Sequence, residues 1–186
     1  MMKKPVKIAK ATEARAPKAP PGSAVDNEQQ HETTNAMLRA AMAQKMNVAF
    51  SQVLSLMLRN QAYRTHFIAE LEWMLVPPIS TGQFLVTERK ASANDIPTPV
   101  AAVMWAKVND AVNKRLLAGG GRPKLAPAEW ASGNIPWLVD AIGEPQETAK
   151  LVKHLAEKIF AKEGLRANER QPDGSYKTRI FGRQSS

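Results

Sequence analysis

The segment EWASGNIPWLVDAIG, at positions 129–143, decides the fold. Its apolar part, PWLVDAIG at 136–143, is too short for a typical helix and is bounded by Pro136 and Gly143, so it predicts a strand. Asp140 directly follows the apolar run Trp137-Leu138-Val139. Two interpretations of this carboxylate are open. It faces solvent, or it lies in a partly dry site, where it needs a donor or a cation because burial disfavours its charge.

Apolar patterns on both sides of this segment predict a sheet with helices. Upstream, GQFLVTER (82–89) and VAAVMWAKV (100–108) predict two strands joined by a polar hairpin loop. Downstream, ETAKLVKHLAEKIFAKEG (147–164) predicts a helix that ends at Gly164. Its inward face is expected to carry Leu151, Val152, Leu155, Ile159 and Phe160. DGSYKTRIFGR (173–183) begins with an Asp-Gly turn signal and predicts a last strand or hairpin arm.

Three further segments predict helices. TTNAMLRAAMAQKMNVAFSQVLSLMLRN (33–60) lacks Pro and Gly, and its Met-rich face is expected to pack on the domain or on a partner subunit. AYRTHFIAELEWML (62–75) predicts a second helix, which must end at Pro77-Pro78. NDAVNKRLLAGGG (109–121) predicts a short helix terminated by its three glycines. We therefore expect one α/β or α+β domain over 33–186, preceded by a disordered basic, Pro- and Ala-rich extension over 1–32.

Composition excludes several classes of site. The chain has no cysteine, so disulfides, thiolate metal sites and a cysteine nucleophile are excluded, and its three histidines are not at metal-ligand spacing. Most of the net charge of +9 comes from the two ends, since residues 26–165 hold 15 basic and 14 acidic residues. The hypothesis that the chain binds nucleic acid therefore rests on its net charge alone. No apolar run is long enough for a bilayer and no signal peptide is evident, so a cytoplasmic protein is expected.

Taken in order, several segments resemble the RTX toxin-activating lysine acyltransferases. VPPISTGQFLVTER resembles that family's corner before a Gln-aromatic strand, and PVAAVMWAKV resembles its Pro-Val-Ala strand ending in Trp-Ala. EWASGNIPWLVDAIG matches its Glu/Asp-Trp-x-Ser-Gly block and the Trp-hydrophobic-hydrophobic-Asp that follows. The likeness covers about residues 48–183 and ends at GSYKTRIFGR.

The resemblance implies a fold similar to the acetyltransferase (GNAT-like) superfamily, with a mixed sheet flanked by helices and often a homodimer. It also implies transfer of a fatty acyl group from acyl carrier protein to internal lysines of a secreted RTX-type protein, with no bound cofactor and no metal. The family's catalytic aspartate matches Asp140. An ungapped match of the VPPI corner places Tyr63 at the family's histidine, Arg64 at the arginine after it and Asn60 at its serine.

His66 is one helical turn beyond Tyr63 in the expected helix, and we hypothesise that it supplies the displaced imidazole. In this hypothesis Asp140 orients His66, which deprotonates the target lysine, while Tyr63 donates a hydrogen bond to the thioester. The expected substrate-binding residues are Asn60, Arg64, Trp105 and Trp137. The departures at Asn60 and Tyr63 keep a second reading open, in which a noncatalytic relative binds acyl chains or chaperones a secreted partner. Acyl carrier protein is acidic, so basic residues are expected to steer its docking.

Overall fold

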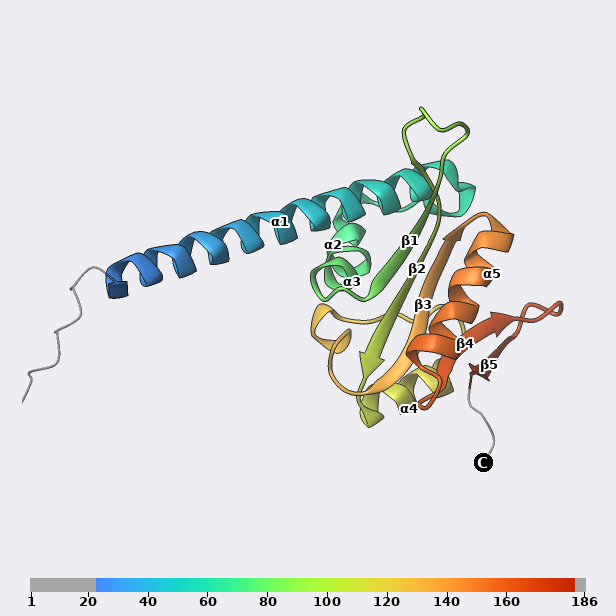
Figure 1. Cartoon of the computed structure of the whole chain (residues 1–186). Coiled ribbons are helices and arrows are strands. Elements are labelled where there is room, and N and C mark those ends of the chain that lie inside the picture. The colour runs from blue at the N-terminus through green and yellow to red at the C-terminus, as the bar shows by residue number, and fades with distance from the viewer. Residues whose placement is uncertain (1–22, 183–186) are drawn as a thin grey trace, which may run out of the picture. The chain divides into compact units, whose positions relative to one another are not determined.

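A computed structural model describes residues 23–182, which contain one five-stranded sheet in the order β1-β2-β3-β4-β5 (Figure 1). Neighbouring strands are antiparallel except β3 and β4, which are parallel, so the sheet is mixed. This confirms the expected α/β class and is compatible with the acetyltransferase-like fold. The strands are β1 (Phe84–Arg89), β2 (Thr98–Val108), β3 (Ile135–Gly143), β4 (Leu165–Arg170) and β5 (Tyr176–Phe181).

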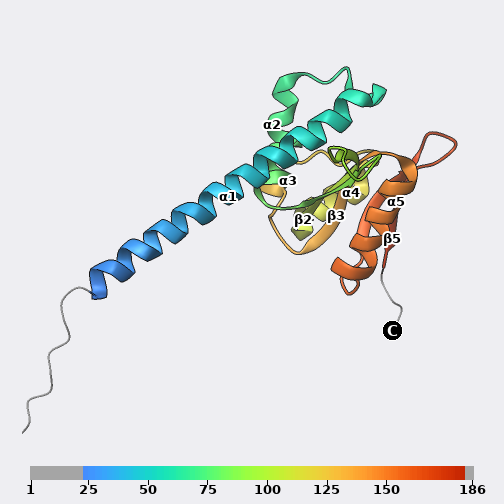
Figure 2. The same ribbon diagram turned by 45° about the horizontal axis from the view of Figure 1, so that its top comes forward.

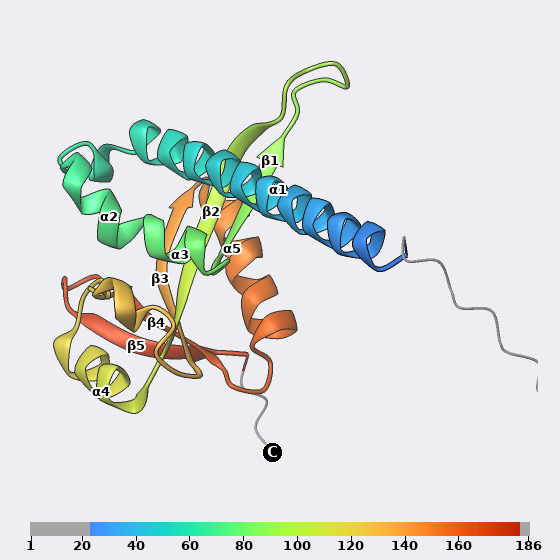
Figure 3. The ribbon, with the colours of Figure 1, turned by 90° about the vertical axis from the view of Figure 1, so that its left-hand side faces the viewer.

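Helices cover both faces of the sheet (Figures 2 and 3). On one face lies α5 (Pro145–His154), continued by a π-helical turn, η4 (Leu155–Ile159), and its core includes Trp105, Leu155 and Phe160. On the other face, the later part of α1 (Ser23–Arg59) packs Val53 and Leu56 with core residues of the sheet. The same core includes residues of α2 (Leu71–Met74), α3 (Val76–Ser80) and α4 (Asp110–Gly119). No helix within residues 23–182 is long and apolar enough to cross a membrane.

The chain divides into two compact units at residues 41 and 42. Helix α1 begins at Ser23 and continues through the boundary expected at residue 33. Of the extension expected over 1–32, residues 1–22 lie outside the described residues. From Ala49 onward the apolar face of α1 is buried, whereas Met42 is 70% exposed. The Met-rich face therefore packs on the domain only in its later part, and its contact with a partner subunit stays a prediction.

The single helix expected over 62–75 is wrong. The structure has two 3₁₀ turns, η1 (Gln61–Tyr63) and η2 (Ile68–Glu70), before the short helix α2. Phe67 between the turns is extended, and its backbone N–H donates to the Glu70 carboxylate at 2.9 Å. Tyr63 is buried and bonded to Asp140 of β3, and this tertiary contact overrides the helical pattern of the sequence. Pro77 and Pro78 end α2 as expected and then occupy the first turn of α3, where their missing N–H groups cost nothing.

The expected inward position of Ile159 is also wrong, since this side chain is 42% exposed. Phe160 N donates to Leu155 O at 2.8 Å, an i to i+5 bond that closes the π turn. The wider turn shifts the buried face, so Leu155 and Phe160 face inward and Ile159 faces solvent. The strand β4 was not among the predicted elements, although the arm β5 that pairs with it was.

Candidate active site

The segment before β3 is held against the core by the residues of the Glu-Trp-Ala-Ser-Gly motif. Trp130 Nε1 donates to the Trp73 carbonyl at 3.1 Å, and the Ser132 hydroxyl accepts from Asn109 N at 3.1 Å. Gly133 lies so close to β2 that a Cβ atom there would be 2.5 Å from the Val108 carbonyl oxygen. These contacts set the position at which the chain enters β3.

A bulge in β3 directs Asp140 to its site. Opposite β2, Leu138 pairs with Trp105 and Asp140 pairs with Met104, so Val139 is the extra residue. Strict alternation would place Leu138 and Asp140 on the same face. The bulge instead places Leu138 with the α5 core and Asp140 on the face that carries Tyr63.

The Asp140 side chain is buried, with 7% of the residue exposed, and one of its oxygens takes all its recorded bonds. Oδ1 accepts from the Tyr63 hydroxyl at 2.6 Å, from Arg122 Nη2 at 2.5 Å and from Ala141 N at 2.9 Å. Oδ2 is buried and has no hydrogen-bond partner among the described residues. Of the two interpretations from sequence, the structure supports the second: Asp140 lies in a dry site and is compensated by a cation. Oδ2 is therefore a buried acceptor that no described donor satisfies.

Tyr63 enters this site from η1, at the end of the turn that follows α1. Its burial, and next the charge and hydrogen bond of Asp140, raise the pKa of the phenol well above its ordinary value, and these effects outweigh the opposing effect of Arg122. Tyr63 therefore stays a neutral donor near neutral pH and is not a general base. The Arg122 guanidinium also lies over the Tyr63 ring, 4.7 Å from its centroid, and donates from Nη2 to the Tyr63 hydroxyl.

Arg122 is a site residue that reasoning from the sequence missed. Burial lowers the pKa of its guanidinium, but Asp140 and Tyr63 together outweigh this effect and raise it, so Arg122 is charged. It follows the glycine triplet after α4, where Gly120 and Gly121 adopt positive φ angles of 57° and 84°. The Gly121 carbonyl accepts from Asn168 Nδ2 of β4 at 2.8 Å. The triplet was interpreted only as a helix stop, and this positive-φ turn leads directly to Arg122.

His66 is bonded to a different carboxylate. Its Nδ1 lies 2.8 Å from Glu70 Oε2, and its ring centroid is 5.7 Å from that of Tyr63. The bond from His66, followed by the Phe67 N–H, lowers the pKa of Glu70, so this carboxyl is ionised and acts as the acceptor. Since Glu70 accepts, His66 Nδ1 carries the donated proton, and Nε2 is the acceptor in the neutral tautomer. No hydrogen bond between His66 and Asp140 is recorded within residues 23–182, and the catalytic role of His66 stays a prediction.

The remaining predicted site residues lie at different depths. Trp137 is fully buried and its Nε1 donates to Asn113 Oδ1 at 3.0 Å, while Trp105 packs edge-on against Phe160. Asn60 caps η1, where its Oδ1 accepts from Ala62 N, and Arg64 is exposed. The two tryptophans are thus core residues, and the structure leaves Asn60 and Arg64 closer to solvent.

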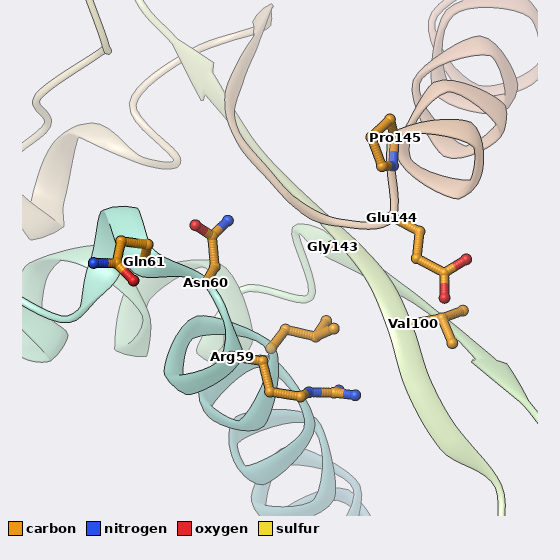
Figure 4. A pocket seen from close by; sticks show the side chains of 8 residues that line it. Arg59, Asn60, Gln61, Val100, Gly143, Glu144 and Pro145 are labelled. Carbon is orange, nitrogen blue, oxygen red and sulfur yellow. The ribbon is translucent and has the colours of Figure 1, made fainter.

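Two pockets lie next to β3. The first, of about 440 Å³, places Arg59, Asn60 and Gln61 opposite the end of β3 and the start of α5 (Figure 4). The second, of about 510 Å³, lies between β3, α5 and β4, and Leu138, Ala141, Val152, Ala156 and Ala167 contribute to its walls. The recorded pairing of β3 with β4 is at Trp137 and Arg166 alone, so the later part of β3 is not paired with β4 and the groove opens there. We call this second pocket the β3–β4 groove.

Among the described residues, no three His, Cys, Asp or Glu side chains are grouped to hold a metal ion. The site instead combines a buried carboxylate with one free oxygen, a guanidinium beside it and a groove one residue away at Ala141. No curated protein matches the chain. The model of the RTX toxin acyltransferase family matches residues 42–182, which include the whole site. The chain therefore belongs to the RTX toxin acyltransferase family.

Proposed function

We propose that this acyltransferase moves a fatty acyl group from acyl carrier protein to internal lysines of a secreted RTX-type protein, and that it does so without a bound cofactor. Family membership supports acyl transfer and toxin activation. The observation that carries the proposal is Asp140, a buried carboxylate with one oxygen saturated by donors and the other oxygen buried without a donor. An amine about to be acylated needs such an acceptor.

The β3–β4 groove is the proposed site of the carrier's thioester-linked arm. It is open, it is mainly apolar, and it ends beside Ala141, the neighbour of Asp140. Strand β3 borders it without pairing with β4 beyond Trp137, and an extended arm with amide groups can bond to a strand edge of this kind. A donor bound here has its thioester near the β3 bulge. At this bulge the Asp140 side chain points to the opposite face of the sheet.

The target lysine needs help to react, because its reference pKa of about 10.4 leaves the neutral amine scarce near pH 7. Asp140 Oδ2 is buried in the structure, so the step requires the adjoining side chains to move aside; Oδ2 then accepts a hydrogen bond from the ammonium and holds it in place. In the neutral tautomer with its proton on Nδ1 beside Glu70, His66 Nε2 takes the first proton. The amine nitrogen then attacks the thioester carbon, the C–S bond breaks and the amide forms. The amine's second proton and the proton on His66 are released, one to the departing thiolate and one to solvent.

Arg122 stabilises the negative charge that develops on the thioester oxygen, while Tyr63, whose single O–H is donated to Asp140, holds Asp140 and Arg122 in position. Arg122 has five N–H donors, and the bonds to Asp140 and Tyr63 come from Nη2 alone. Its side chain is 39% exposed, so it links the buried carboxylate to the surface from which substrate arrives. Fixed donors of this kind are effective because they need no reorganisation when charge develops.

A second candidate function is favoured by the bond between Tyr63 and Asp140. The resemblance implies that in other members of the family the matching aspartate pairs with a histidine, and in this chain it pairs with a tyrosine. In that alternative the chain binds acyl groups or chaperones a secreted partner without transferring anything. Co-expression with the candidate protein and acyl carrier protein, followed by mass spectrometry, separates the two. A fatty acyl mass on lysine requires the enzyme, and an unmodified partner that is nevertheless bound requires the alternative.

A further inference from the structure

An apolar pocket lies beside the site and is not used by the chemistry described above. Its walls come from the last turns of α1 and from the loop that carries η2, and they include Leu54, Met57, Leu58, Phe67, Ile68 and Leu71. Tyr63 and His66 line it as well. We call it the Leu58 pocket. Its volume is about 140 Å³, which is close to that of apolar cavities that bind benzene.

The rim of the Leu58 pocket is unusually apolar for a surface loop. Phe67 and Ile68 are 78% and 87% exposed, and Leu58 is 66% exposed. Single exposed apolar residues are common, but three of them around one apolar pocket mark a binding surface. The rim residues are grouped beside a reactive centre, because Tyr63 is shared by the Leu58 pocket and by the bond to Asp140.

The pocket in Figure 4 is disfavoured for a hydrocarbon chain by its polar lining, and the β3–β4 groove by its position on the opposite face of the sheet from Tyr63. The pocket in Figure 4 has Arg59, Asn60, Gln61 and Glu144 in its walls. The β3–β4 groove lies on the α5 face of the sheet, whereas Tyr63 lies on the other face. Besides its apolar residues, the groove is lined by the polar residues Lys153, Glu157, Asn168 and Glu169. In the described part of the Leu58 pocket, the charged or titratable lining residues are Tyr63, Arg64 and His66.

We propose that the Leu58 pocket binds the acyl chain of the donor while the β3–β4 groove binds its thioester arm. This inference rests on the proposed function and adds the place of the chain. The donor then crosses the sheet beside the β3 bulge, with its arm on the α5 face and its hydrocarbon on the Tyr63 face. The benzene-sized volume accommodates about six carbons, and the exposed rim of Leu58, Phe67 and Ile68 covers the carbons beyond them.

Chain length is the variable that tests this placement. Burial of each methylene is worth about fourfold in affinity. Calorimetric titration of the full chain with acetyl-, hexanoyl- and dodecanoyl-pantetheine should show affinity rising by about fourfold per carbon until the pocket is filled. In protein labelled with ¹³C at its methionine methyl groups, the Met57 resonance should shift with the dodecanoyl donor and stay in place with the acetyl donor.

Two variants with the same new side chain separate the chain site from the arm site. Leu58→Trp fills the mouth of the Leu58 pocket from an exposed position, so it should lower dodecanoyl affinity by at least tenfold more than acetyl affinity. Ala149→Trp narrows the β3–β4 groove, also from an exposed position, and should weaken all three donors by a similar factor. Circular dichroism of both variants serves as the control for folding.

Each outcome has a separate meaning. If donors bind and lysine is acylated, but Leu58→Trp leaves the gain with chain length unchanged or Met57 does not shift, the placement of the chain is wrong and the proposed function stands. If the Met57 resonance shifts with protein concentration instead of donor, a second copy of the chain covers the pocket and the placement is again wrong. If no pantetheine donor binds the wild-type chain, the placement is contradicted, and absence of lysine acylation in co-expression with acyl carrier protein contradicts the proposed function as well.

Discussion

The Tyr63 hydroxyl donates a 2.6 Å hydrogen bond to Asp140 Oδ1, and this bond joins the turn after α1 to the bulge of β3. The two residues are far apart in sequence and meet in a buried site. Arg122 completes the group, because its Nη2 donates to the Tyr63 hydroxyl oxygen and to Asp140 Oδ1. The site is therefore a neutral phenol, a carboxylate and a guanidinium, in which one carboxylate oxygen is buried without a donor among the described residues.

Replacing Tyr63 by phenylalanine should destabilise the fold. A hydrogen bond to a charged group is worth about 1.5–3 kcal/mol, and Asp140 Oδ1 would retain only Arg122 and Ala141 as donors. Urea unfolding measures the loss. Tyr176→Phe is the matched control, because Tyr176 is 45% exposed and should change the free energy of unfolding little. Equal effects of the two substitutions would contradict the buried bond.

Alkaline titration should fail to ionise Tyr63 near its ordinary pKa of about 10. Burial and Asp140 raise its pKa in the folded state, so the neutral phenol contributes stability that is complete below pH 10. That stability falls as the pH rises above 10, where the phenol of the unfolded chain ionises first. Subtracting the phenolate absorbance of Tyr63→Phe from that of wild type should leave no signal near pH 10. A normal titration step in that difference would contradict the buried position of Tyr63.

Replacing Arg122 by methionine leaves a buried carboxylate without its cation. The expected cost is about 2 kcal/mol, less than for a fully buried pair because Arg122 is partly exposed. Arg115→Met is the control, since Arg115 forms a 2.5 Å ion pair with Glu129 at a more exposed position and its loss should cost less than about 1 kcal/mol. Arg122→Lys should recover stability only in part, because a lysine lacks the planar fork. If Arg122→Met is no more destabilising than Arg115→Met, Arg122 does not compensate the buried charge of Asp140.

Glu70 should act through His66. Glu70→Gln removes the carboxylate that holds the proton on Nδ1, so we expect slower lysine acylation and a displaced pH–rate profile. His66→Ala should lower the rate by about 10²–10⁴-fold. Glu72→Gln and His154→Ala are exposed controls on neighbouring elements and should retain wild-type rates. A wild-type pH–rate profile in Glu70→Gln would show that the Glu70 bond only stabilises the loop.

The elements that the sequence predicted well are those whose pattern is local. β1, β2, β3 and α4 follow from short apolar runs and from glycine or proline at their ends. The prediction of one helix over 62–75 is wrong because the burial of Tyr63 against Asp140 outweighs the helical spacing of the apolar residues in this segment. Ile159 was misplaced because a π turn changes the helical period without any sequence signal.

The candidate site was predicted only in part for the same reason. Asp140 and Tyr63 were singled out from a motif, and the structure joins them. The direction of Asp140 depends on a one-residue bulge at Val139, which arises from pairing with β2 and leaves no trace in β3 itself. Arg122 could not be predicted because its position depends on a positive-φ turn that brings it to a distant strand.

The most direct test of the central claim is mass spectrometry of the candidate RTX-type protein after co-expression with acyl carrier protein and either wild-type chain or Asp140→Asn. Asparagine keeps the shape of the side chain and removes the charge, and Asp95→Asn in the exposed β1–β2 loop is the control. The account predicts a fatty acyl mass on lysine with wild type and with Asp95→Asn, and at least a hundredfold less with folded Asp140→Asn. Undiminished acylation by Asp140→Asn, or none by the folded wild-type chain, would contradict it.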